Sequence, residues 1–392
     1  MNSERLILET PYGTRDLLPA DAAAMRHMEN MLSSLFLCWG YHEVVTPTIE
    51  HLETLAPRMQ DENSLFMLLG NKNKLLALRN EMTTPIARLV SSRLKDDPRP
   101  LKLSYIGNVF RMEQTQMGRQ CEFHQAGVEV MGSDSPASDA EIIALAIEAI
   151  LKSGIKDFQI HMGQIAFLDA VLSYFEIEDV QRKALKSAIE CHDIVLMDRI
   201  IDALPLSEQD KLAIKQLPLL NGKEDLLQKL YDFPRSEQSH SAIDNLEEIY
   251  RILKSYGFSD YVRFDLGIIR DFNYYTGMVF EGYAPGLGFP LCGGGRYDRL
   301  LTEYGHPMPA TGFALGIERL LLTLERQGGR VPSPSKNFYV GYGESSIGSA
   351  IQRASELRHA GNTVELGLHS QSYEEAESSR VERGCEQLEY FE

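Results

Sequence analysis

Length and charge set the first limits on this protein. The chain has 392 residues, which predicts two or three domains. Its 56 acidic and 39 basic residues give a formal charge of −17, which argues against a general nucleic-acid binder because phosphate contacts need a surplus of Lys and Arg. Five scattered cysteines and ten histidines without metal-binding spacing predict neither a disulfide framework nor a metal site, and they favour a reducing cytoplasm. The sequence shows no apolar leader and no apolar run of about 18 residues, so we expect no membrane contact.

The first half of the chain predicts a sheet with flanking helices. Apolar periodicity and turn residues indicate, in chain order, a helix that follows Pro19 and ends at Gly40, a strand at 41–45, a hairpin at 64–79, a helix at 85–94, a long hairpin with strands at 103–110 and 122–131, a helix at 138–153 and a strand at 158–162. We expect Thr84 to be the N-cap of the helix that Pro85 enters.

The second half begins with a helical insertion at about 168–257, followed by strands at 262–266 and 277–282, a glycine-rich strand near 293–295 and a helix at 312–325. A Pro/Ser linker then separates a domain at 1–330 from a segment at 336–392. In that segment a strand, a helix and a strand at 338–341, 348–359 and 363–366 predict one βαβ unit plus a tail. The whole predicts an α+β fold: a mixed, mostly antiparallel sheet with flanking helices, the insertion and a small C-terminal α/β unit.

The long hairpin carries a polar stripe. Arg111 and Glu113 alternate on one strand, and Gln125, Gly127 and Glu129 alternate on the returning strand, so each set shares one face of the sheet. A solvated face with scattered charges is the alternative interpretation. The length of the stripe and the motifs nearby favour a ligand site.

Two other segments add candidate ligand residues. Tyr274 and Tyr275, in IIRDFNYYTGMVFEG, could wall a small polar ligand, or they could pack within a strand. Glu81 and Thr83, in LRNEMTTP, are either ligand contacts or solvated side chains. Arg319, in GFALGIERL, is a candidate basic anchor beside glycines that permit close approach, with a surface arginine as the alternative.

No nucleophilic or phosphate-loop motif accompanies these residues. GGGRYD lacks the spacing of a P-loop or a Rossmann loop, no GxSxG occurs, and Cys191 has nothing evident to orient it. His124 points away from the polar stripe, and we expect it to be packed or hydrogen-bonded rather than a ligand.

These pieces, in this order, resemble class II aminoacyl-tRNA synthetases, and histidyl-tRNA synthetase in particular. GTRD with Pro19 resembles the N-terminal signature of that family, GYHEVVTPTIE its motif 1, FRME with GRQCEFHQAGVEVMG its motif 2, and GFALGIERL its motif 3. RDFNYYTGMVFE and GGGRYD resemble its two histidine-specific segments. The likeness covers about residues 8–326, and motif 1 implies a homodimer formed through residues near 28–50.

The resemblance implies a histidine-like pocket and a vestigial nucleotide site. Carboxylates and tyrosines suit a ligand that bears an ammonium group and an imidazole. The implied pocket residues are Glu81, Thr83, Arg111, Gln125, Glu129, Arg270, Tyr274 and Tyr275. The implied nucleotide residues are Arg111, Glu113 and Arg319.

Several departures from the synthetase pattern point away from tRNA charging. Gln114, Met117 and Cys121 hold positions that are basic in the motif 2 loop of the family. Asp271 stands beside Arg270 and should weaken its field. The resemblance also implies that the segment 336–392 is a truncated, anticodon-binding-like α/β remnant. This segment has five basic residues against ten glutamates, a balance that would repel tRNA.

This combination is similar to the regulatory subunits of ATP phosphoribosyltransferase. The resemblance implies a chain with no catalysis and no cofactor of its own, which joins a short-form catalytic subunit as a homodimer within a hetero-octamer. It also implies a place in the first step of histidine biosynthesis, with feedback inhibition by histidine and no tRNA as ligand. The alternatives are an enzyme that forms histidyl-adenylate and, less favoured, a divergent tRNA synthetase.

Overall fold

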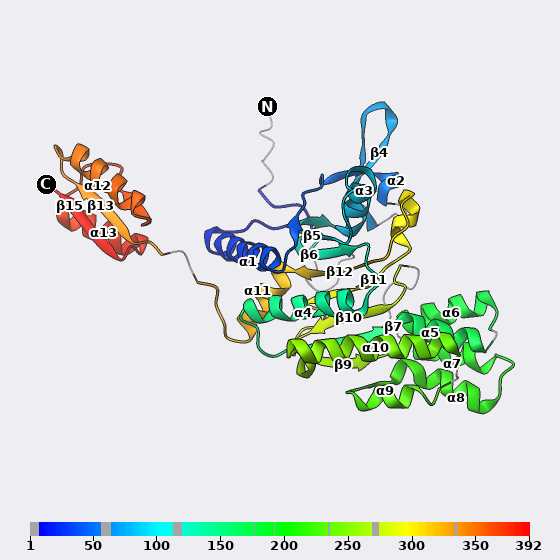
Figure 1. Cartoon of the computed structure of the whole chain (residues 1–392). Helices are drawn as coiled ribbons and strands as arrows, with labels where there is room; N and C mark the ends of the chain where they lie inside the picture. Colours follow the sequence, from blue (N-terminus) through cyan, green and yellow to red (C-terminus); the bar gives the residue numbers. More distant parts are fainter. Residues whose placement is uncertain are drawn as a thin grey trace. The chain divides into compact units, whose positions relative to one another are not determined.

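The computed structural model describes residues 8–55, 64–112, 120–175, 177–191, 193–233, 236–268, 274–332 and 335–392. The chain forms two compact units, Met1–Arg330 and Val331–Glu392 (Figure 1). Among the described residues, no helix combines the length and the apolar character that crossing a bilayer needs.

A nine-stranded sheet forms the centre of the first unit. Its spatial order is β1 (His42–Glu43), β5 (Leu101–Phe110), β6 (Glu122–Met131), β12 (Ala310–Gly316), β11 (Cys292–Arg296), β10 (Met278–Tyr283), β7 (Gln159–Gln164), β9 (Val262–Asp265) and β8 (Asn221–Gly222). Only the β1–β5 and β7–β9 pairs are parallel. The prediction of a mixed, mostly antiparallel sheet, with the long hairpin β5–β6 within it, is therefore confirmed.

Helices cover one face of this sheet. Figure 1 shows α1 (Pro19–Cys38), α11 (Ile317–Arg326), α4 (Pro136–Lys152) and α10 (Glu237–Tyr256) arranged along it, and α4 contacts both α1 and α10. Phe313 and Phe280 pack toward this layer, where Phe36 of α1 meets Phe313 edge-on at 6.3 Å. α4 is buried along most of its length because it lies between the sheet and α10, which explains its strongly apolar sequence.

A small sheet stands beside the main one. It consists of β2 (Ile49–His51), β4 (Leu75–Leu78) and β3 (Met67–Leu69), with the short helices α2 (Leu52–Leu55) and η3 (Asn71–Asn73). β3 and β4 are antiparallel, so the hairpin predicted at 64–79 is confirmed. The helix α3 (Thr83–Arg93) follows and leads back to β5.

The helical insertion consists of α5 (Ile165–Tyr174), α6 (Asp179–Glu190), α7 (Ile194–Asp202), α8 (Glu208–Gln216), η4 (Leu217–Leu219), α9 (Asp225–Leu230) and α10. These helices run from Ile165 to Tyr256, and the sequence analysis expects the insertion at about 168–257. Gly257 ends α10 in a left-handed conformation, with φ of 79°, which favours glycine because a side chain would be strained there.

The second unit is a three-layer α/β structure. Its parallel sheet has the order β14 (Val364–Leu366), β13 (Phe338–Tyr342), β15 (Gln387–Phe391). α12 (Ile347–His359) packs through Ala354 against Val340, and α13 (Tyr373–Arg383) packs through Ala376 against Tyr339. Because Val340 and Tyr339 are neighbours on a strand, the two helices lie on opposite faces of the sheet.

The expectation of one βαβ unit plus a tail is wrong for the tail. Residues 373–391 form α13 and β15, which complete a second βαβ unit. Local signals for α13 exist in the sequence: the Ser372 hydroxyl caps the helix, Glu375 completes the capping box, and Gly384 ends it with φ of 69°.

Replacing Ser372 with alanine tests the importance of this cap. The Ser372→Ala variant loses the acceptor for the Glu375 N–H, so we expect α13 to be less stable by about 1 kcal/mol. We expect this loss of stability to appear as faster amide hydrogen exchange in α13, measured on the full chain. Ser370→Ala, in the preceding loop, is the control, and equal exchange in the two variants would contradict the prediction.

Candidate functional site

The open face of the main sheet has a floor of small residues. Strand register aligns Glu281, Gly293, Ala314, Gly127 and Tyr105 in one row across five strands. Residues that pair directly across antiparallel strands point to the same face. The middle of the row therefore carries no side chain larger than a methyl group, and the backbone is open to a ligand.

A second row continues the floor and adds a carboxylate. Gly295 pairs with Gly312, which pairs with Glu129. A Cβ atom at Gly312 would overlap the Glu129 Oε2 atom, and one at Gly127 would overlap the Tyr105 hydroxyl. Backbone carbonyl oxygens also approach these Cβ positions, that of Val128 at Gly312 and that of Phe313 at Gly127, so glycine is required at both.

The floor belongs to a cavity of about 470 Å³. The cavity brings together most of the residues that the sequence analysis singled out from distant parts of the chain. Those lining it are Glu81, Thr83, Arg111, Gln125, Glu129, Tyr274, Tyr275 and Arg319. Arg270 and Glu113 lie outside the described residues, as do Gln114 and Met117.

Glu81 is held at the beginning of α3. Its two carboxylate oxygens accept hydrogen bonds from the backbone N–H groups of Thr83 and Thr84, at 2.7 and 2.8 Å. A carboxylate at this end is also favoured by the helix dipole. The prediction that Thr84 is the N-cap is wrong: the N-cap residue is Met82, and Glu81 accepts the hydrogen bonds that a cap would accept.

Glu129 is supported by a tyrosine that the sequence analysis did not select. The Tyr297 hydroxyl donates to the Glu129 carboxylate, and the Tyr297 ring stacks on Tyr274 with centroids 5.0 Å apart. Tyr274 in turn meets Tyr275 edge-on at 4.7 Å. Burial, reinforced by the Glu129 charge, raises the pKa of Tyr297, so its hydroxyl remains a donor. The glycines before it in GGGRYD were the available signal, since they mark a strand that a ligand or another backbone approaches closely.

Two guanidinium groups lie at the same cavity, each above an aromatic ring. Arg111 donates from Nε to the Asn80 carbonyl at 2.8 Å and lies 5.4 Å from the Phe123 ring centroid. Arg319 has the same kind of environment: it donates to the Pro290 carbonyl at 2.7 Å and lies 5.0 Å from the ring centroid of Phe289. The combination of a carbonyl and an aromatic face orients both cations.

The helical insertion also reaches the cavity. Glu190, the last residue of α6, is among the lining residues, although nothing in its helical periodicity had distinguished it. The cavity therefore presents carboxylates from three separate elements, Glu81, Glu129 and Glu190, together with Arg111 and Arg319. Such a lining fits a small zwitterion with an additional hydrogen-bonding group.

His124 is a hydrogen-bonded histidine on the other side of β6, as expected. Its Nδ1 atom lies 2.8 Å from the Glu318 carboxylate, which also accepts from the His124 backbone N–H. The hydrogen bond to Glu318 raises the pKa of His124, although burial opposes the rise. Across the described part of the chain, no group of three His, Cys, Asp or Glu side chains is arranged to hold a metal ion.

One family model and several curated relatives match most of this chain. The family model described as histidyl-tRNA synthetase matches residues 13–320. A relative from Moorella thermoacetica is 41% identical, covering 97% of this chain and 98% of its own, and one from Desulforamulus reducens is 39% identical, covering 97% and 95%. Both are named ATP phosphoribosyltransferase regulatory subunit.

Solved structures agree with this likeness. A Bacillus halodurans protein described as an ATP phosphoribosyltransferase regulatory subunit/histidyl-tRNA synthetase superposes with a TM-score of 0.88 at 32% identity, covering 99% of both chains. Histidyl-tRNA synthetase from a Nostoc species gives a TM-score of 0.85 at 23% identity, covering 98% of this chain and 91% of its own, which indicates the shared fold.

The glycine floor can be tested by adding one methyl group. Gly312→Ala would push its Cβ into the Glu129 carboxylate, so we expect a loss of about 1–3 kcal/mol in the free energy of unfolding, measured by urea titration. Gly288→Ala is the control, because nothing lies within 4 Å of a Cβ at that position. Equal stability of the two variants would contradict the close packing of Glu129 against Gly312.

The His124–Glu318 pair predicts a pH-dependent stability. Because the folded-state pKa of His124 is raised, the pair contributes fully below the unfolded value of about 6.5 and its contribution is lost as pH rises through the folded value. Glu318→Gln should therefore reduce the free energy of unfolding by about 1–2 kcal/mol at pH 5.5, and by less at pH 8.5. Urea unfolding at both pH values measures this, and a pH-independent difference would argue against the ion pair.

Proposed function

The chain belongs to the family of ATP phosphoribosyltransferase regulatory subunits, and from this membership we propose how it works. It performs no catalysis alone. It binds a short-form catalytic subunit, is required for the first step of histidine biosynthesis on that partner, and transmits feedback inhibition by histidine. The observation that carries this function is the likeness to the named subunits over nearly the full length of both chains.

We propose that histidine binds in the cavity of the main sheet. A volume of about 470 Å³ lies in the range of small-molecule sites. The carboxylates of Glu81 and Glu129 suit the ammonium and imidazole N–H groups, and Arg111 suits the carboxylate of an amino acid. Arg270 and Glu113 remain proposed members of the pocket and of the nucleotide site on the strength of the resemblance.

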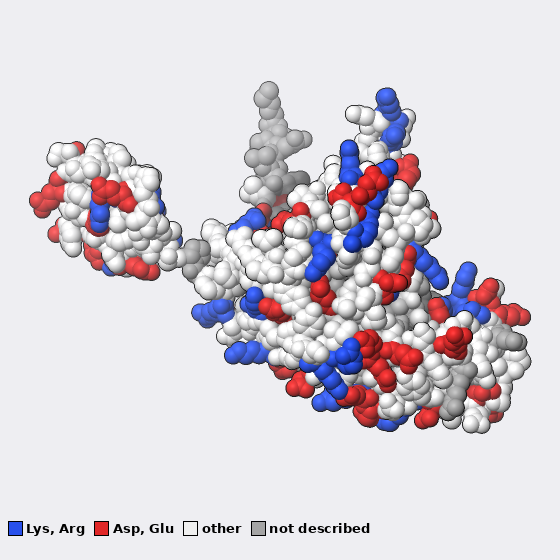
Figure 2. All heavy atoms as spheres, viewed as in Figure 1, with Lys and Arg blue, Asp and Glu red and all other residues white. Residues whose placement is uncertain are grey.

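The charges of the second unit support the proposal that tRNA is not a ligand. All five of its basic side chains bond within the unit. Arg353 pairs with Glu389 at 2.7 Å, Arg380 with Glu377 at 2.6 Å and Arg383 with Glu365, while Lys336 and Arg358 donate to backbone carbonyls. Figure 2 shows acidic side chains standing among the basic ones on the visible face of the protein. Phosphate binding would have to break these internal pairs.

Histidyl-adenylate formation is the second candidate function. The observation in its favour is that Arg111 and Arg319 line the same cavity as the carboxylates, as a site for an amino acid and a nucleotide would require. ATP–pyrophosphate exchange in the presence of histidine separates the candidates, because robust exchange by the purified chain would exclude a purely regulatory protein.

Assembly is proposed to follow the family pattern. Two copies of the chain would form a homodimer through residues near 28–50, and this dimer would be part of a hetero-octamer with the catalytic subunit. We propose that the complex is located in the cytoplasm. Leu37, Val45 and Ile49 are exposed apolar residues in this segment, with exposed fractions of 63%, 81% and 48%. Contact between copies would remove this apolar surface from water.

The regulatory function predicts activity only on mixing. The purified chain should show no ATP phosphoribosyltransferase activity, and a short-form catalytic subunit alone should show little. Combining the two should give activity that histidine inhibits, measured by pyrophosphate release. Full activity of the catalytic subunit alone, unchanged by this chain, would contradict the proposal.

The histidine pocket predicts a loss of feedback in a cavity variant. Glu129→Gln removes the charge that would face the ligand, so the histidine concentration for half-inhibition of the mixed enzyme should rise by about tenfold or more. Glu148→Gln, which changes a glutamate on α4 that accepts from Trp39, is the control. Unchanged inhibition in Glu129→Gln would remove this cavity from the regulatory route.

A further inference from the structure

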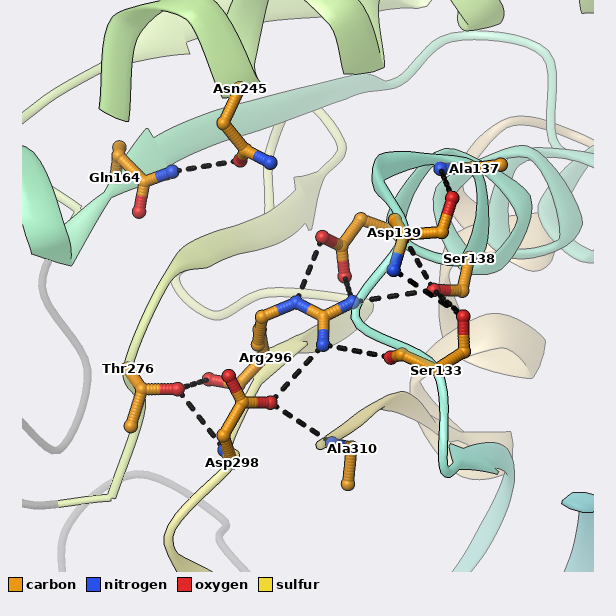
Figure 3. Close-up of polar contacts among 11 residues, drawn as sticks. Ser133, Ala137, Ser138, Asp139, Gln164, Asn245, Thr276, Arg296, Asp298 and Ala310 are labelled. Atoms are coloured by element: carbon orange, nitrogen blue, oxygen red, sulfur yellow. Dashed lines mark hydrogen bonds and ion pairs between the residues drawn. The ribbon is translucent and has the colours of Figure 1, made fainter. Parts of the chain in front are cut away.

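A buried ion pair lies behind the cavity, on the helical side of the sheet (Figure 3). Arg296, the last residue of β11, donates from Nε and Nη2 to the two carboxylate oxygens of Asp139, at 3.0 and 2.9 Å. The exposed fractions of the two side chains are 9% and 1%. The Nη1 group of Arg296 also donates to the Ser133 carbonyl at 3.0 Å and to Asp298 at 3.1 Å. These contacts fix the start of α4 against the end of β11.

The stability of the fold alone does not require such a pair. Removing two charges from water costs free energy, and apolar residues of similar volume often serve a core equally well. The bidentate geometry of a guanidinium and a carboxylate instead specifies one orientation.

The backbone of Arg296 connects the ion pair to the tyrosine wall of the cavity. The Arg296 carbonyl accepts from the Thr276 N–H at 2.8 Å. The Thr276 hydroxyl also donates to that carbonyl at 3.4 Å and accepts from the Asp298 N–H at 3.1 Å (Figure 3). Thr276 directly follows Tyr274 and Tyr275. The position of these two rings along the cavity is thus tied to residues 296 and 298.

The side chain after Arg296 reaches the cavity from the other direction. Tyr297 donates to Glu129 and stacks on Tyr274. Two successive residues therefore link α4 to the cavity: Arg296 pairs with Asp139 of α4, and Tyr297 contacts Glu129 and Tyr274, which line the cavity.

We propose that Arg296 is a positioning residue for the ligand cavity, holding Tyr274, Tyr275 and Glu129 in one arrangement relative to α4. The proposal rests on the proposed function, in which this cavity binds histidine. The same contacts could transmit ligand binding from the cavity to the helical layer. α4 packs on α10, and α10 is joined to the end of β7 through Asn245, which accepts from Gln164 at 3.0 Å (Figure 3). A ligand that orders Tyr274 and Tyr275 would therefore favour one packing of α4 against α10.

Two variants test the positioning role. Arg296→Lys keeps the positive charge but loses the fork that grips both oxygens of Asp139. Thr276→Val leaves the ion pair intact and removes the hydroxyl contacts with the Asp298 N–H and the Arg296 carbonyl. Calorimetric titration with histidine, on the full chain and on its complex with the catalytic subunit, should show binding weakened by about tenfold in Arg296→Lys and about threefold in Thr276→Val. If Arg296→Lys does not fold, Thr276→Val decides.

The readout must separate positioning from folding. A purely structural role would lower the melting temperature of the free variant and leave its dissociation constant for histidine unchanged well below that temperature. Positioning instead reduces the rise in melting temperature that histidine produces, measured against each variant's own ligand-free value. Arg353→Lys is the matched control, because Arg353 makes the same bidentate contact with Glu389 in the other unit.

The outcomes distinguish this proposal from the one on which it rests. If the unmodified protein binds histidine and both variants bind it equally well, Arg296 is only structural and the cavity retains its function. If the unmodified protein binds no histidine, either alone or in the complex, the cavity assignment fails and the positioning role fails with it. Weakened binding in both variants, with Arg353→Lys unchanged, supports the inference.

Discussion

The small residues on the open face of the main sheet are the constraint on which the site depends. Gly293, Ala314 and Gly127 lie side by side because the register of three strands aligns them. The adjacent row points to the opposite face of the sheet, toward the helices, and carries Phe280 and Phe313. A slip of one residue would exchange the two faces, since side chains alternate along a strand. The phenylalanines would then fill the cavity, and the helical layer would lose its apolar contacts. The apolar core on one face and the ligand site on the other thus require the same register of the strands.

Around this floor, four charged side chains are already held by the protein. Backbone N–H groups hold Glu81, and the Tyr297 hydroxyl supports Glu129. Carbonyl groups and aromatic faces hold Arg111 and Arg319. Side chains that are ordered in advance lose less conformational entropy when a ligand arrives. This arrangement suits recognition, and it is consistent with a family that keeps the synthetase fold in a regulatory subunit.

Features that depend on local rules could be predicted from the sequence. The period of two along β6 placed Gln125 and Glu129 on one face and His124 on the other, and both placements hold in the structure. Helical periodicity located the insertion, and the resemblance to known motifs gathered residues that the chain separates widely. Three local predictions are wrong. Glu81, not Thr84, accepts the hydrogen bonds at the start of α3, and residues 373–383, expected as part of a tail, form α13 behind a capping box. Residues 312–316 belong to strand β12, so the helix expected at 312–325 begins only at Ile317.

Composition, periodicity and motif order by themselves determined the sheet-and-insertion architecture and the residues of the hairpin face, because these depend on neighbours in the sequence. Only the tertiary structure decided that Tyr297 meets Glu129 across 168 positions of chain, that Glu190 reaches the cavity from α6, and that Arg296 joins α4 to the tyrosine wall. Each of these contacts is made by one side chain whose direction is set by how strands and helices pack. No spacing along the chain encodes such a direction, since it arises from the register of the sheet and the layer of helices against it.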